Sequence, residues 1–209
     1  MAGAVRAIFT NNGEICLAGS RLLVERPLHE EFLERFAAAT SALRVGDPKD
    51  PRTDVGPLVE QAHLEKVDGY VRLGVEEGGQ VVVGGGPSAD PELAGGLYYA
   101  PTVLDAMRND MRAVREEIFG PVQVIVPFDA EEEALAFAND SDYGLAGMLW
   151  TSDLDRAHRM AEHWRTGMVW VNCFFERDLR LPFGGEKASG MGREGGHTPV
   201  NSSPTPALW

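Results

Sequence analysis

The chain has 209 residues, of which 44% are hydrophobic and 24% charged, and its formal net charge is -13. These values are ordinary for a globular protein and exclude a chain that is disordered throughout. The negative charge would repel a phosphate backbone, so we expect no nucleic acid partner. No apolar run is long enough to cross a bilayer and no signal peptide is visible, so we expect no membrane association and a cytoplasmic location.

The first part of the chain predicts a helix, a turn and a strand. Apolar residues have helical spacing over residues 4–9, and the Asn-Asn-Gly run at 11–13 then ends the helix. Residues 22–24, Leu-Leu-Val, are typical of a buried strand. Cys16 lies between these elements among polar and small residues, so we expect its thiol in a turn. The alternative is a buried, inert cysteine.

Amphipathic patterns predict helices at residues 27–42 and about 60–77; the first has Pro near its start and the second ends at a Gly pair. Between them, residues 44–58 are dense in Gly, Pro and Asp, which predicts an ordered loop or a chain of turns. Residues 81–83 are predicted as a buried strand. The Gly triplet at 84–86 lacks the lysine and the helix of a phosphate-binding loop, so we interpret it as a turn.

The second half alternates further strands and helices. Strands are predicted at residues 97–104, 123–128, 146–150 and 168–172, with helices at 131–139 and after the capping pair at 152–153. This alternation predicts an α/β domain with a largely parallel sheet, and the length favours one domain. Gly190, Gly192 and Gly195 have the spacing of a dinucleotide-binding fingerprint but not its strand and helix context, so we assign no phosphate to them.

The cysteine segment resembles the active-site signature of the aldehyde dehydrogenase superfamily. Phe9, Asn12, Gly13, Glu14 and Cys16 all lie where that pattern places an aromatic residue, Asn-Gly-Glu and the nucleophile. Further motifs of this family follow in order: Gly56-Pro57-Leu58, Pro101-Thr102-Val103, the Glu-Glu-Ile-Phe-Gly-Pro run at 116–121, Asn139, Tyr143-Gly144-Leu145, Asn172, the Pro-Phe-Gly-Gly-Glu-Lys run at 182–187, Ser189-Gly190 and Gly192-Arg193-Glu194. The resemblance extends from about residue 4 to residue 196.

The resemblance implies the three-layer α/β/α catalytic domain of the aldehyde dehydrogenase fold over residues 1–196. Residues 197–209 are rich in Pro and Ser, and we expect a disordered, atypical tail there. In this family the cofactor domain, a glutamate general base and an oxyanion-stabilising asparagine precede the cysteine, and we expect none of them in this chain. The family forms homo-oligomers, and we expect the strand that usually follows the Gly-Arg-Glu motif to be missing.

The resemblance also implies an oxidation that uses NAD. Cys16 would attack a small-molecule aldehyde to form a thiohemiacetal and then a thioacyl enzyme, which is hydrolysed. Glu117 would hold the nicotinamide ribose, and Phe119 would pack beside the nicotinamide. We expect no metal site, since His158 and His163 are five residues apart and do not share a helical face.

Residues 170–183 resemble the dehydrogenases of 2-hydroxymuconic semialdehyde and its relatives in aromatic compound catabolism. Arg177 would then lie on the loop that lines the substrate tunnel, together with Phe175 and Phe183. A guanidinium among aromatic side chains suits a substrate with a carboxylate at the end far from its aldehyde. Arg180 is a second candidate for this role.

Other interpretations stay open at this stage. Arg177 or Arg180 can instead pair with a neighbouring acidic residue, Glu176 or Asp178, at the surface, and Cys173 is predicted as a small core residue. The chain can also be a truncated, inactive fragment that only associates with full-length subunits. A weak thiol esterase is a third hypothesis, although none of the five histidines shows an obvious pairing with Cys16.

Overall fold

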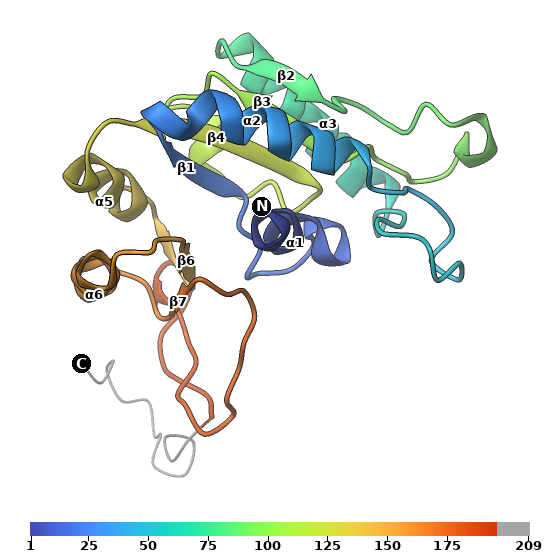
Figure 1. Ribbon diagram of the computed structural model, residues 1–209. Coiled ribbons are helices and arrows are strands. Elements are labelled where there is room, and N and C mark those ends of the chain that lie inside the picture. The colour runs from blue at the N-terminus through green and yellow to red at the C-terminus, as the bar shows by residue number, and fades with distance from the viewer. Residues whose placement is uncertain (196–209) are drawn as a thin grey trace. The chain divides into compact units, whose positions relative to one another are not determined.

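The computed structural model describes residues 1–195 and divides the chain into two compact units, Met1–Glu131 and Glu132–Trp209 (Figure 1). The predicted domain over residues 1–196 stays a prediction, because a division into compact units does not decide whether one domain or two are present. The predicted tail at 197–209 lies outside the described residues.

The first unit is built on a four-stranded sheet. Its strands are β1 (Arg21–Glu25), β4 (Val122–Phe128), β3 (Thr102–Asp105) and β2 (Gln80–Val83), in the spatial order β1-β4-β3-β2. β1 and β3 both run parallel to β4, and β2 is antiparallel to β3. The sheet is therefore largely parallel, as the alternation of strands and helices predicts.

The helices of this unit are α1 (Ala2–Phe9), α2 (Arg26–Ser41), α3 (Gln61–Glu76) and α4 (Arg112–Arg115), with two 3₁₀ turns, η1 (Thr10–Gly13) and η2 (Pro91–Leu93). α2 lies along the sheet in front of β1 and β4 (Figure 1). Its Phe36 is fully buried and stacks on Phe32 and Phe9 at centroid distances of 5.6 and 6.3 Å. Ile8, Val24 and Ile125 belong to the same cluster, so α1, which leads into the cysteine segment, is fixed by the core.

Three predicted strands differ from those observed. Residues 22–24 are predicted as a buried strand, but β1 is an edge strand in which only Val24 is buried. The prediction that residues 81–83 are buried is wrong, because β2 is an edge strand in which Val81 and Val82 are 42% and 39% exposed. Only the end of the predicted strand 97–104 joins the sheet. Tyr99 forms an isolated bridge with Pro87 and is buried, and the ladder begins after Pro101, which has no N–H to donate.

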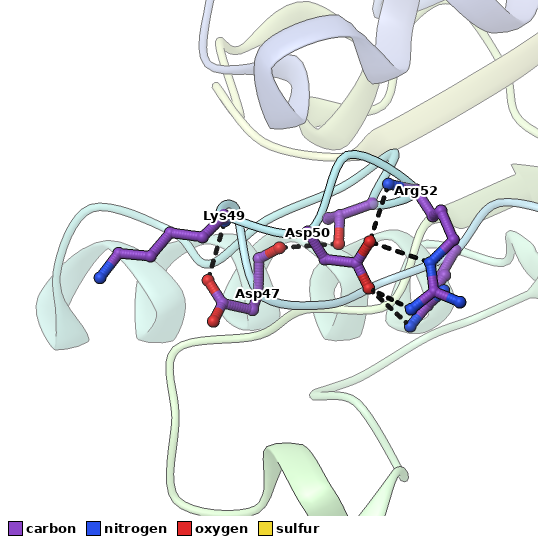
Figure 2. A network of polar contacts seen from close by, with 6 residues as sticks. Asp47, Lys49, Asp50 and Arg52 are labelled. Carbon is purple, nitrogen blue, oxygen red and sulfur yellow. Dashed lines mark hydrogen bonds and ion pairs between the residues drawn. The ribbon is translucent and has the colours of Figure 1, made fainter.

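The loop at residues 44–58 is ordered by its own polar side chains, as predicted (Figure 2). The carboxylate of Asp50 accepts hydrogen bonds from the backbone and the guanidinium of Arg52, at 2.8–3.0 Å, and pairs with Arg44 at 3.0 Å. The hydrogen bond from the Arg52 side chain is the main reason that the pKa of Asp50 lies below its ordinary value. Asp47 accepts the backbone N–H of Lys49 at 2.9 Å in a similar turn.

The second unit carries two helices and two small pairs of strands. The helices are α5 (Glu131–Asn139), which begins at the boundary, and α6 (Leu154–His163). β6 (Gly147–Leu149) runs parallel to β7 (Val169–Val171), and β5 (Tyr143–Gly144) pairs antiparallel with β8 (Glu186–Lys187). Asp153 caps α6 as predicted, since its carboxylate accepts the N–H of Arg156 at 3.0 Å. Among residues 1–195, no helix is long and apolar enough to cross a membrane.

Candidate active site

Cys16 lies in a tight turn whose neighbours are fixed to the core. The turn is closed by a hydrogen bond from the N–H of Ala18 to the carbonyl of Ile15 at 2.9 Å, and Cys16 itself is exposed. Leu17 is only 4% exposed, and the N–H of Gly19 donates to the carbonyl of Ala7 in α1 at 2.9 Å. The alternative of a buried cysteine is therefore wrong, and the predicted turn is confirmed.

The approach to this turn has an unusual backbone. Asn11, Asn12 and Gly13 have φ values of 51°, 60° and 69°, in the left-handed region that Asn and Gly tolerate better than other residues. The side-chain amide of Asn12 accepts the N–H of Gly56 at 2.8 Å and donates to the carbonyl of Pro57 at 3.0 Å. These bonds join the cysteine loop, residues 10–20, to the Gly-Pro-Leu motif more than forty residues later in the chain.

Glu14, two residues before the cysteine, is largely enclosed. Only 12% of its side chain is exposed. One carboxylate oxygen accepts the N–H of Val59 at 3.3 Å and lies 3.3 Å from Nε2 of His63, while Asn12 donates to the other oxygen at 3.4 Å. The carboxylate therefore anchors the cysteine loop to the start of α3.

A second loop touches the cysteine loop. This Phe119 loop covers residues 116–121, and the backbones of Gly13 and Gly120 are in such close contact that a Cβ on Gly13 would lie 2.2 Å from the Gly120 carbonyl oxygen. Phe119 is half-buried, and Glu117 is exposed. The structure thus brings the loop of the predicted nucleophile and the loop of the two predicted cofactor residues into contact within the first unit.

The two adjacent glutamates of the Phe119 loop have different environments. Glu116 accepts hydrogen bonds from Arg112 at 2.7 Å and from the Tyr70 hydroxyl at 2.8 Å. These two bonds, the first being the stronger influence, lower the pKa of Glu116. Glu116 is thereby held by α3 and α4, whereas Glu117 presents its carboxylate to solvent, where a ligand can reach it.

Two histidine pairs were not visible in the sequence. His63 contacts Glu14 and also lies 2.6 Å from the carbonyl oxygen of Phe119, and His29 pairs with Asp105 at 2.7 Å. Neither pair includes Cys16, so the interpretation that no histidine pairs with the thiol stays a prediction. Both pairs join residues more than forty positions apart, so no local spacing could have indicated them.

The predicted substrate residues lie in the second unit. The guanidinium of Arg177 lies 4.2 Å from the centre of the Phe183 ring and 3.4 Å from the Glu194 carboxylate, and 26% of the side chain is exposed. The backbones of Phe183 and Glu194 exchange two hydrogen bonds of 2.7 Å, which bring both partners to the arginine. Phe175 is 42% exposed, and its ring packs against that of Phe174.

Arg180 has a different environment from Arg177. Its guanidinium binds Asp178 with bonds of 2.9 and 3.0 Å from Nε, and 89% of its side chain is exposed. The hydrogen bonds from Arg180 lower the pKa of Asp178. The alternative of pairing with a neighbouring acidic residue at the surface is therefore correct for Arg180. Arg177 pairs instead with a residue distant in sequence. Cys173, predicted in the core, is only half-buried.

An exposed thiol on a tightly held turn, in an α/β unit with a largely parallel sheet, defines a candidate nucleophile of the cysteine-enzyme class. The model of the aldehyde dehydrogenase family matches residues 1–203, and the chain belongs to this family. It is 49% identical over 195 residues to 2-hydroxymuconic semialdehyde dehydrogenase from Pseudomonas sp. (strain CF600). It is 50% identical over 196 residues to 5-carboxymethyl-2-hydroxymuconate semialdehyde dehydrogenase from Escherichia coli.

These alignments cover 93% and 92% of this chain but only 40% and 42% of the two relatives, so the chain spans about 40% of their length. Among solved structures, PnpE from Pseudomonas sp. WBC-3 in complex with nicotinamide adenine dinucleotide superposes with a TM-score of 0.90 at 45% identity, over 93% of this chain and 40% of that one. The predicted aldehyde dehydrogenase fold is confirmed. Within residues 1–195, no three His, Cys, Asp or Glu side chains gather as a metal site.

Proposed function

We propose that this chain supplies the nucleophile, part of the nicotinamide site and the carboxylate-binding loop of an NAD-dependent semialdehyde dehydrogenase. The observation that carries the proposal is the contact between two loops. Cys16 lies exposed in one loop, and Glu117 and Phe119 lie in the other. The names of the relatives support a semialdehyde as the substrate.

The chemistry of these residues suits the cofactor. The exposed carboxylate of Glu117 can accept hydrogen bonds from the hydroxyls of a ribose, and the half-buried ring of Phe119 offers an apolar surface to a planar ring. NAD, when bound, supplies the acceptor for the hydride that leaves the substrate carbon. Beside it, the chain's own residues keep the Cys16 loop in one conformation.

Cys16 carries the covalent steps. Its thiolate attacks the aldehyde carbon, a C–S bond forms, and the carbonyl oxygen takes up a proton to give the thiohemiacetal. Loss of a hydride and a proton from that adduct leaves a thioester. Water then breaks the C–S bond, which releases the carboxylic acid and restores the thiol.

Arg177 is the residue that we assign to the far end of the substrate. Its stacking on Phe183 fixes the guanidinium, while its ion pair with Glu194 is long, at 3.4 Å, and Glu194 is 68% exposed. A long ion pair with an exposed carboxylate contributes little, so a substrate carboxylate can replace Glu194 at small cost. Phe175 and Phe183 supply apolar surface beside it. Arg180 is the weaker candidate, because Asp178 already occupies its guanidinium.

The first test is a calorimetric titration of the folded chain with NAD, run beside an assay of NADH formation from a carboxylated semialdehyde. Because the proposal gives this chain only part of the nicotinamide site, heat of binding with NADH formation would show that the chain also supplies a base by itself. In that case turnover should be lost and binding retained in Cys16→Ser. A folded sample that neither binds NAD nor forms NADH would show that this chain does not perform the reaction by itself. Association with full-length subunits would then be the hypothesis to examine.

The substrate assignment can be tested without turnover. An aldehyde that adds reversibly to Cys16 protects the thiol from iodoacetamide, so protection by carboxylated and plain aldehydes can be compared. We expect Arg177→Ala to weaken protection by the carboxylated aldehyde by about tenfold, the value of one charge-assisted hydrogen bond. Arg180→Ala is the matched control and should change it little. If Arg177→Ala leaves the preference unchanged, the substrate assignment is wrong.

A further inference from the structure

His63 lies where the two loops of the candidate site meet. Its Nε2 atom is 2.6 Å from the carbonyl oxygen of Phe119 and 3.3 Å from a carboxylate oxygen of Glu14, and 11% of its side chain is exposed. A carbonyl oxygen can only accept, so Nε2 must carry the proton in this arrangement. One N–H group is therefore directed at acceptors from both loops.

His63 also contacts the side chain of Phe119. The two rings meet edge to face, with centroids 6.1 Å apart and an interplanar angle of 68°. Phe119 has a φ of 60°, a conformation that a bulky residue adopts only when its surroundings impose it. The hydrogen bond to its carbonyl and the ring contact supply such a constraint, and both come from His63.

His63 is carried by a helix that the core holds in place. His63 lies in the first turn of α3, a helix of 16 residues whose Leu64, Val67 and Val71 are buried. On the other side of the contact, Glu14 is only two residues from Cys16. A displacement of the His63 ring would therefore change the position of the Cys16 turn relative to Phe119, while α3 itself stays in place.

We propose that His63 is a positioning residue that sets the placement of the Cys16 turn relative to Phe119 through its shared N–H. The close contact of Gly13 with Gly120 limits how far the loops can approach, and His63 limits how far they can separate. This inference rests on the proposed role of Cys16 as the nucleophile. Its test, however, needs neither NAD binding nor turnover.

The test compares the rates at which iodoacetamide alkylates Cys16 and Cys173 in the full chain, measured by peptide mass spectrometry. Cys173 belongs to the second unit and serves as the internal reference. In His63→Ala the cysteine loop is freed, and we expect the Cys16-to-Cys173 rate ratio to rise about threefold to tenfold, the range that loss of one hydrogen bond allows. His63→Gln keeps an N–H donor of similar reach and should restore the ratio to within about twofold of the parent.

His29→Ala is the matched control, because it removes the other half-buried histidine pair of the same unit without touching either loop. It should leave the rate ratio unchanged. Should His63→Ala not fold, His63→Asn replaces it, since its shorter amide cannot reach both acceptors. An unchanged ratio in the folded Ala or Asn variant, or a Gln variant that behaves like them, overturns the positioning role. A titration without heat of NAD binding would instead show that the chain does not bind the cofactor by itself, and the rate ratio could still be measured.

Discussion

Gly13→Ala is the substitution with the largest effect that we expect on the cysteine loop. Gly13 has a φ of 69°, and a Cβ at this position would lie 2.2 Å from the carbonyl oxygen of Gly120. The left-handed conformation costs a residue with a side chain about 1–2 kcal/mol. Overlap with a backbone atom that cannot rotate away adds about 1–3 kcal/mol, as in overpacked cores. We therefore expect the free energy of unfolding to fall by about 2–5 kcal/mol.

Two other glycines separate these contributions. Gly95 has a φ of 79° with no atom within 4 Å of an added Cβ, so Gly95→Ala should cost only the conformational part, about 1–2 kcal/mol. Gly69 lies inside α3, where an added Cβ meets nothing within 4 Å, and Gly69→Ala should stabilise the chain by about 0.5–1 kcal/mol. The measurement is urea unfolding followed by circular dichroism. A Gly13→Ala cost no larger than that of Gly95→Ala would contradict the close contact between Gly13 and Gly120.

Two further predictions concern other polar pairs of the first unit. His29→Ala leaves Asp105, whose side chain is 13% exposed, without this partner and should lower the free energy of unfolding by about 1–3 kcal/mol. By contrast, removing the solvent-exposed ion pair of Arg35 should have no measurable effect on this free energy. Burial, and then the nearby Asp68 charge, raise the pKa of Tyr99. The protonated Tyr99 hydroxyl therefore contributes fully to the free energy of unfolding below pH 10. As the pH rises further, this contribution is lost at up to about 1.4 kcal/mol per pH unit. The stability difference between the parent and Tyr99→Phe should shrink above pH 10, and a constant difference in urea unfolding up to pH 11.5 would contradict this assignment.

Local signals in the sequence were enough to predict the turn that carries Cys16. The Asn-Asn-Gly run favours a helix end, and Leu22 to Val24 form a short apolar run typical of a strand. The contacts that hold this turn were not predictable in the same way. Asn12 reaches Gly56 and His63 reaches Phe119 across 44 and 56 residues, and such pairs depend on how the sheet is assembled.

The prediction that β2 is buried failed for a related reason. A run of three valines has the same pattern at the centre and at the edge of a sheet, and only the strand order places Val81 and Val82 at the edge. The different environments of Glu116 and Glu117 could likewise not be predicted from the sequence. The partners of Glu116, Arg112 and Tyr70, come from two different helices. Resemblance supplied the candidate residues, whereas the neighbours that set their charge and position required the structure.

Three of the seven non-glycine residues with positive φ in the described part of the chain lie in the two loops that touch each other. Asn11 and Asn12 in the cysteine loop and Phe119 in the second loop all have positive φ, a conformation that costs about 1–3 kcal/mol for each residue. The compensating interactions are the two hydrogen bonds of the Asn12 side chain with Gly56 and Pro57 and the contacts of His63 with Phe119, and all of them join residues distant in the chain. An unfolded first unit would lose these contacts, and the strained backbone would relax. We therefore infer that the geometry of the thiol turn forms together with the fold of the first unit and does not await a substrate.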